Sequence, residues 1–362
     1  MNLTKRQTWI HSATVDGLGI LVWPFIILAV IVIFPEYFSE HAEVSPLVWI
    51  LIVMGIDVSH VYSTLFRTYL DPITYRRHKQ FLLLVPFLVW VAGIILYTFG
   101  ALIFWRMLAY LAVYHFIRQQ YGFLKIYMRT ENKNTWLYTY TIYVMYAITG
   151  IPILIWHCST DRIFVWFVKN DFISLHFQYM VPYLKNLLAL IVVVYIFFEL
   201  AGSIKRRYIN IPKNVLLLGT FISWYMGIVY FNSDLIFTLF NVVSHGVPYM
   251  VLIWIYGSKK SGDVATPQWY RFLFNWKGVV MYAAILLVFA FIEEGLWNSM
   301  IWNEHQNYFH LFNAMPSIND SILISLLFPL LSVPQISHYI IDGYIWKLKD
   351  DRYSWKKEVL DS

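Results

Sequence analysis

Four histidines lie within strongly apolar stretches of the sequence. They are His60, His115, His245 and His338. Imidazole nitrogens bind iron, copper and zinc, whereas magnesium and calcium prefer oxygen ligands. The single cysteine, Cys158, excludes a thiolate metal cage. If the four histidines come together, they therefore form a nitrogen-rich site for a transition metal.

Each histidine has a polar companion at helical spacing, which places the two side chains on one helix face. A metal-bound imidazole usually donates its second N–H to a carboxylate, amide or carbonyl. We therefore predict a metal site made by the four histidines, a catalytic role for Asp57 beside them, and cofactor-binding roles for the other companions. The companions are Asp57, three residues before His60; Gln119, four after His115; Asn241, four before His245; and Asp342, four after His338.

The composition shows which elements must carry these side chains. The 362 residues are 59% hydrophobic and only 13% charged, whereas about a quarter of the residues in soluble domains are charged. Apolar runs of about 18 residues or more indicate membrane-spanning helices. We predict an all-α, polytopic, multi-pass integral membrane protein that forms a single transmembrane domain over 1–362, in the inner cell membrane if the source is bacterial. It has about ten transmembrane helices, at 15–34, 46–70, 81–99, 101–127, 136–157, 181–203, 214–231, 234–257, 277–296 and 320–346.

The charges between these runs give an orientation. Lysines and arginines cluster before the first run and after every second one, while the opposite loops are acidic, as the positive-inside rule requires. Both termini are then cytoplasmic, as an N-terminal segment 1–14 and a C-terminal tail 347–362. The net charge of +6 is spread over short clusters, which indicates retention in the membrane rather than binding of nucleic acid.

The predicted spans place the four histidines at one depth. They lie 9 to 13 residues from the first cytoplasmic polar residue of their spans, or about 14–20 Å at 1.5 Å per residue. That range is narrow against a core of ~30 Å. Asp57 is 14 residues from Asp71, at a depth of about 21 Å. An unpaired carboxylate at the centre of the core costs roughly 2.5–3.5 kcal/mol, so Asp57 requires a nearby cation or protonation.

A metal held in mid-bilayer favours chemistry on a hydrophobic substrate. Zinc would imply hydrolysis by a metal-bound water, and copper also suits histidine ligands, but we favour iron. The expected activity is that of a metal-dependent oxidoreductase: a non-heme iron oxygenase, desaturase or hydroxylase in lipid metabolism. Its substrate would be lipid-like or isoprenoid and would enter from the membrane lipids, and a redox partner could supply electrons to an oxygenase.

The many-helix layout, with histidines on separate spans, resembles the bacterial membrane-embedded carotene dioxygenases that make retinal. That resemblance implies iron held by histidines from different helices. The sequence departs from the membrane desaturases and hydroxylases, because it lacks their His-x-x-His-His boxes. His245-Gly246 is similar to the buried histidine of membrane-bound O-acyltransferases, although Asn241 lies closer in sequence than the asparagine of that family.

Three other interpretations of the histidines remain. Pairs of histidines on facing helices could ligate heme b in an electron-transfer protein. Asp57 and the histidines could form the proton relay of a proton-coupled transporter. The histidines could also be structural, with hydrogen bonds between neighbouring helices.

Overall fold

The computed structural model describes residues 7–160, 162, 165–262, 266–318 and 320–347, and every element in these ranges is helical. Helices satisfy their own backbone hydrogen bonds, which the bilayer core demands. Eight helices are long and apolar enough to cross a membrane: Pro46–Arg67, Pro72–Thr98, Ala101–Tyr127, Trp136–Cys158, Gln178–Arg206, Asp234–Lys260, Val279–Trp302 and Ser321–Ile345. A ninth results if Ala13–Leu21 and Trp23–Ile33, bent by 55°, form one broken span. The protein is therefore a helical, multi-pass integral membrane protein.

The predicted count of ten spans stays a prediction. The segment expected at 214–231 is helical, but it is not among these eight or nine. This helix starts at Ile211 and contains the charged Lys213 in its first turn. Thr220 and Ser223 lie in its interior. These polar residues make the segment less apolar than the other spans. Of the predicted N-terminal segment 1–14, the structure describes residues 7–14. Of the predicted tail 347–362, it describes only Lys347. The cytoplasmic position of the termini also stays a prediction.

The chain forms two compact units. Unit 1 contains 1–44 and 113–248, and unit 2 contains 45–112 and 249–362. The division falls within two long helices, α7 (Ala101–Tyr127) and α12 (Ser244–Lys260). The prediction of one transmembrane domain over 1–362 stays a prediction.

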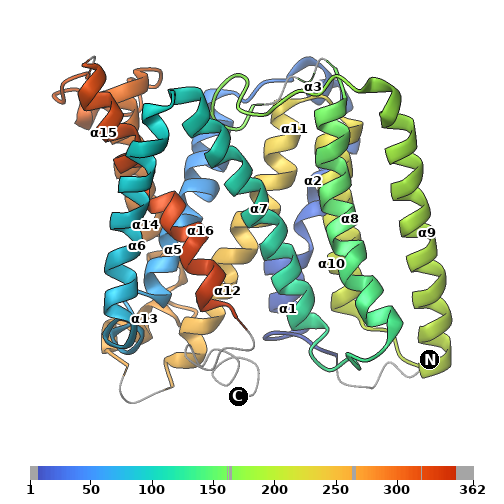
Figure 1. The fold of residues 1–362 in the computed structure, drawn as a ribbon. Coiled ribbons are helices and arrows are strands. Elements are labelled where there is room, and N and C mark those ends of the chain that lie inside the picture. Colours follow the sequence, from blue (N-terminus) through green and yellow to red (C-terminus); the bar gives the residue numbers. More distant parts are fainter. Residues whose placement is uncertain (1–6, 161, 163–164, 263–265, 319, 348–362) are drawn as a thin grey trace. The chain divides into compact units, whose positions relative to one another are not determined.

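In unit 1, α8 and α9 run side by side (Figure 1), and α10 packs against both α8 and α2. A buried ion pair reinforces this packing: Lys213 Nζ of α10 lies 2.9 Å from Glu199 Oε1 of α9. Besides parts of α7 and α12, the helices of unit 1 are α1 (Ala13–Asp16), η1 (Gly17–Leu21), α2 (Trp23–Ile33), α3 (Pro35–Glu40), α8 (Trp136–Cys158), η4 (Gln178–Met180), α9 (Val181–Arg206), α10 (Ile211–Trp224), η5 (Tyr225–Tyr230), α11 (Asp234–Thr238) and η6 (Leu239–Val243).

In unit 2, α6 packs along both α15 and α16 (Figure 1), around a buried cluster that includes Leu82, Val85 and Ile341. A tight turn follows α6, where Gly100 has a φ of +125°, which only glycine adopts readily. The helices of unit 2 besides parts of α7 and α12 are α4 (Pro46–Val48), η2 (Trp49–Val58), α5 (Ser59–Ser63), η3 (Thr64–Arg67), α6 (Pro72–Thr98), α13 (Gln268–Leu273), α14 (Val279–Trp297), η7 (Asn298–Trp302), η8 (His310–Phe312), α15 (Ser321–Leu331) and α16 (Val333–Ile345).

Helix α6 begins nine residues earlier than expected, at Pro72 rather than residue 81. Asp71 caps it by accepting hydrogen bonds from Ile73 N at 3.1 Å and Thr74 N at 3.3 Å. Proline at the first helical position has the required φ and no N–H to leave unsatisfied. The hydropathy pattern identified the apolar part of the helix and missed this polar, capped first portion.

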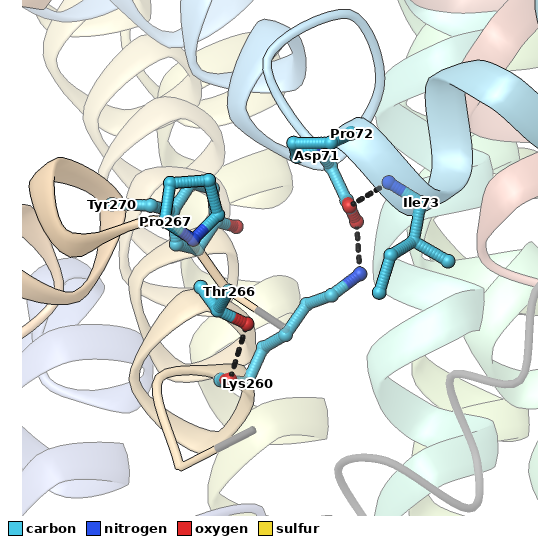
Figure 2. A pocket seen from close by; sticks show the side chains of 7 residues that line it. All are labelled: Asp71, Pro72, Ile73, Lys260, Thr266, Pro267 and Tyr270. Atoms are coloured by element: carbon cyan, nitrogen blue, oxygen red, sulfur yellow. Dashed lines mark hydrogen bonds and ion pairs between the residues drawn. The ribbon is translucent and has the colours of Figure 1, made fainter. Parts of the chain in front are cut away.

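Asp71 also ties α6 to the end of α12. Its carboxylate pairs with Lys260 Nζ (Figure 2). It also accepts a hydrogen bond from Tyr256 Oη at 2.7 Å. Burial raises the pKa of Asp71, but the charge of Lys260 and the hydrogen bonds outweigh it, so the pKa lies below its ordinary value. The surrounding pocket has almost no space that a water-sized molecule could enter, whereas ligand sites enclose roughly 300–1,000 Å³. We interpret this ion pair as structural.

Replacing Lys260 with methionine should reverse the pH dependence of this contact. In the wild type the lowered pKa of Asp71 contributes stability above the ordinary value of 3.8, and that contribution is lost as pH falls through the folded-state value. Without Lys260, burial raises the pKa, so stability is instead lost as pH rises through it. Thermal melting in detergent should show a deficit on the order of 2 kcal/mol near pH 7 that shrinks towards pH 4.

The control for this experiment is Lys259→Met, which removes the same charge from the neighbouring residue. Adjacent helical residues point in different directions, so this variant keeps the Asp71–Lys260 pair and should not show a deficit at pH 7 that shrinks towards pH 4. An equal deficit at pH 4 and pH 7 for Lys260→Met would contradict the interpretation.

Candidate metal centre

Unit 2 holds one pair of the predicted histidines. His60 lies in α5 and His338 in α16, and both side chains are buried. Their ring centroids are 5.0 Å apart and the ring planes make an angle of 77°. The two imidazoles therefore touch edge to face in the interior of this unit.

The acidic companions of this pair lie beside the rings, but too far away for direct hydrogen bonds. Asp57 Oδ1 is 3.7 Å from His60 Nδ1, and Asp342 Oδ1 is 3.6 Å from His338 Nδ1, distances beyond a hydrogen bond. The His60 Nδ1 atom instead faces the carbonyl oxygen of Ile56 at 3.3 Å. Both carboxylates thus act on the rings through space or through other groups.

Two hydroxyl residues of unit 2 contact this pair, and our sequence reasoning missed them. Thr64 Oγ1 lies 2.7 Å from His338 Nδ1 and 2.7 Å from Tyr249 Oη. Tyr249 Oη donates to Asp342 Oδ1 at 2.6 Å. The sequence held a weak signal, because Thr64 follows His60 by four residues. Nothing in that spacing indicated that its partner would be His338.

Unit 1 holds the second pair, His115 in α7 and His245 in α12. The ring centroids are again 5.0 Å apart, at an interplanar angle of 78°. The Phe116 ring stacks on His245 with a centroid distance of 3.6 Å and an angle of 11°. An aromatic wall thus fixes the plane of the His245 imidazole.

The side-chain amides of both companions in unit 1 donate to backbone carbonyls. Gln119 Nε2 donates to the backbone carbonyl of His245 at 2.8 Å, a hydrogen bond that joins α7 to α12. Asn241 Nδ2 donates to the carbonyl of Phe237 at 3.1 Å. Their direct roles in cofactor binding, and the catalytic role of Asp57, stay predictions.

One histidine of each pair follows a π-helical segment. Segment η2 ends at Val58, two residues before His60, and η6 ends at Val243, two residues before His245. A π-turn contains one more residue than an α-turn and therefore rotates the residues around it. Such segments are frequent at functional sites.

The four histidines lie close together. Each offers a ring nitrogen, and the four nitrogens lie within 4.8 Å of one another. Their side chains are nearly solvent-free, with exposures of 2% for His60, 5% for His115, 1% for His245 and 2% for His338. A cluster of three or more histidine, cysteine or acidic side chains could hold a metal ion, and among the described residues these four histidines form such a cluster.

This donor set fits a transition-metal ion. Metal–nitrogen bonds of about 2.0–2.1 Å allow two ligand nitrogens to be at most about 4.2 Å apart. The longest separation, 4.8 Å, exceeds this value by about 0.6 Å even for nitrogens on opposite sides of the ion, so the imidazoles must move closer together by at least that much to bind one ion. Within each unit the paired rings touch, so neither pair alone can lie on the two faces of one heme.

No model of a known protein family matches the chain, and neither does a curated protein or a solved structure. The resemblance to membrane-embedded carotene dioxygenases therefore stays a prediction. The case for function rests on the chemistry of the histidines and on the membrane environment.

Proposed function

We propose that His60, His115, His245 and His338 bind one transition-metal ion and that the protein is an intramembrane metalloenzyme. The observation that supports this proposal is the convergence of four buried imidazole nitrogens within 4.8 Å. A lone buried histidine is commonly a structural hydrogen-bonding group. Helix packing alone does not require four buried histidines to bring their ring nitrogens to one place, so a shared ligand explains their arrangement better.

We propose iron as the metal, with zinc or copper as alternatives. Neutral imidazoles suit all three, and available metal and geometry decide between them. Bound iron would supply dioxygen chemistry, as an oxygenase, desaturase or hydroxylase requires. The chain itself supplies four oriented nitrogens, the carboxylates of Asp57 and Asp342 beside two of them, and an environment that excludes water.

The membrane-spanning helices favour a lipid-like or isoprenoid substrate that enters from the bilayer. Many large apolar side chains are exposed along the membrane-spanning helices, and a lipid-like molecule dissolved in the bilayer would be concentrated around them. The resemblance to carotene dioxygenases belongs to this part of the proposal, as does an inner-membrane location if the source is bacterial. A redox partner would be needed only if the reaction consumes external electrons.

Metal analysis and absorption spectroscopy of the wild-type protein test this proposal. Protein purified in mild detergent should carry about one metal ion per chain and should show no Soret band. Purified protein with a Soret band would favour the heme b electron-transfer alternative. Absence of metal, together with failure to take up Fe²⁺, Co²⁺ or Zn²⁺, would overturn the metalloenzyme proposal and favour a proton relay, to which the contact of Asp57 with His60 is suited.

A further inference from the structure

A buried chain of hydroxyl groups in unit 2 links a carboxylate to His338. Thr64 Oγ1 lies 2.7 Å from His338 Nδ1, and Tyr249 Oη lies 2.7 Å from Thr64 Oγ1. Tyr249 Oη reaches Asp342 Oδ1 at 2.6 Å. All of these side chains are buried. The four groups form a continuous path of short hydrogen bonds.

The direction of each hydrogen bond in this path follows from counting hydrogens. When the Asp342 carboxylate is ionised it only accepts, and the single hydroxyl hydrogen of Tyr249 then goes to Asp342. The Tyr249 oxygen must then accept from Thr64, whose own hydrogen is used in that contact. Thr64 can therefore only accept from His338, and the donor is His338 Nδ1–H.

This directionality determines which nitrogen of His338 has a lone pair. A neutral imidazole has one protonated nitrogen. With the proton on Nδ1, the lone pair lies on Nε2, the nitrogen that could bind a metal. The direct distance from Asp342 Oδ1 to His338 Nδ1 is 3.6 Å, so the carboxylate acts on the ring through two hydroxyls rather than by contact.

We propose that Thr64 and Tyr249 are positioning residues for the metal site, fixing the tautomer and ring orientation of His338 and transmitting the negative charge of Asp342 to it. This inference rests on the proposed function, because it assigns the partners of one metal ligand. Such outer partners raise ligand basicity, and their loss typically lowers metal affinity 10–100-fold.

Titration of metal-free protein with Co²⁺ against a competing chelator tests this inference. Thr64→Val and Tyr249→Phe should each weaken Co²⁺ binding by about 10–100-fold and shift the visible ligand-field bands of the bound ion. Thr64→Ser retains the hydroxyl and should bind like the wild type. The Thr64→Val/Tyr249→Phe double variant should lose little more than either single variant, because both interrupt the same path.

The comparison of Thr64→Ser with Thr64→Val separates positioning from packing. Equal affinities for these two variants would overturn the inference, and so would wild-type affinity and spectrum in Tyr249→Phe. If the wild type binds Co²⁺ and His338→Ala does not, such results refute only the roles of Thr64 and Tyr249. If the wild type itself takes up no Co²⁺, the proposed function fails and this inference fails with it.

Discussion

Replacement of any one of the four clustered histidines by alanine is expected to remove the metal from the purified protein. Four nitrogens within 4.8 Å of one another can ligate a single ion, so each substitution removes one of its direct bonds. Loss of an outer partner already costs 10–100-fold in affinity, and loss of a direct ligand should cost more than about 100-fold. Stoichiometric metal should then fall to trace amounts after purification.

A buried histidine outside the cluster provides the matched control. His157 in α8 has an exposure of 8%, and its Nδ1 atom lies 2.7 Å from the carbonyl oxygen of Ile153. His157→Ala therefore removes a histidine of comparable burial and should retain the metal. His305→Ala and His310→Ala, in the segment that follows η7, should retain it as well.

Double variants show whether both pairs hold the same ion. His60→Ala with His338→Ala removes the unit 2 pair, and His115→Ala with His245→Ala removes the unit 1 pair. Both double variants should lack metal. Full metal content in either one would refute a shared four-histidine site and would assign the ion to the remaining pair.

Thermal melting gives a second measurement of the same prediction. A ligand that binds only the folded protein stabilises it by about 2.7 kcal/mol at a free concentration of 100 times Kd. A chelator should therefore lower the melting temperature of the wild type and of His157→Ala. It should leave the cluster variants unchanged, since they have no bound metal to lose.

The sequence predicted the histidine cluster because depth along a helix can be counted from residue numbers. Each residue adds 1.5 Å, so residues on different spans can be placed at a common depth before any packing is known. Rotation about the helix axis is harder to predict. The π-helical segments η2 and η6 change that rotation next to His60 and His245, and no residue pattern in the sequence marked them.

The sequence also could not predict which side chains on other helices a residue contacts. Tyr249 lies four residues after His245, which indicates a shared face, yet its hydroxyl contacts Thr64 and Asp342. Lys213 fits the positive-inside pattern at a helix end, yet its side chain is buried against Glu199. In both cases the sequence gives the residue's place along its helix, whereas long-range packing determines what the side chain touches.

Replacement of Lys213 by methionine is expected to destabilise unit 1 by about 3–5 kcal/mol. The Lys213 side chain is 1% exposed and lies 2.9 Å from Glu199 Oε1 and 3.2 Å from Glu131 Oε1. Glu199 is itself 4% exposed. Removing the lysine leaves this carboxylate in the interior with only the more distant and exposed Arg206 as a cation, and a poorly compensated buried charge is costly. Denaturation in detergent, followed by circular dichroism, measures the loss.

Arg206→Met is the matched control for this second prediction, because Arg206 also pairs with Glu199, at 3.6 Å, but is 44% exposed. Exposed ion pairs contribute about 0–1 kcal/mol, so this variant should melt close to the wild type. Adding Glu199→Gln to Lys213→Met removes the buried charge and should recover part of the loss, since the two side chains interact directly. A Lys213→Met protein as stable as Arg206→Met would show that the buried pair contributes no more than an exposed one. Metal content should stay at the wild-type level in every variant that folds, because this network contains none of the four histidines.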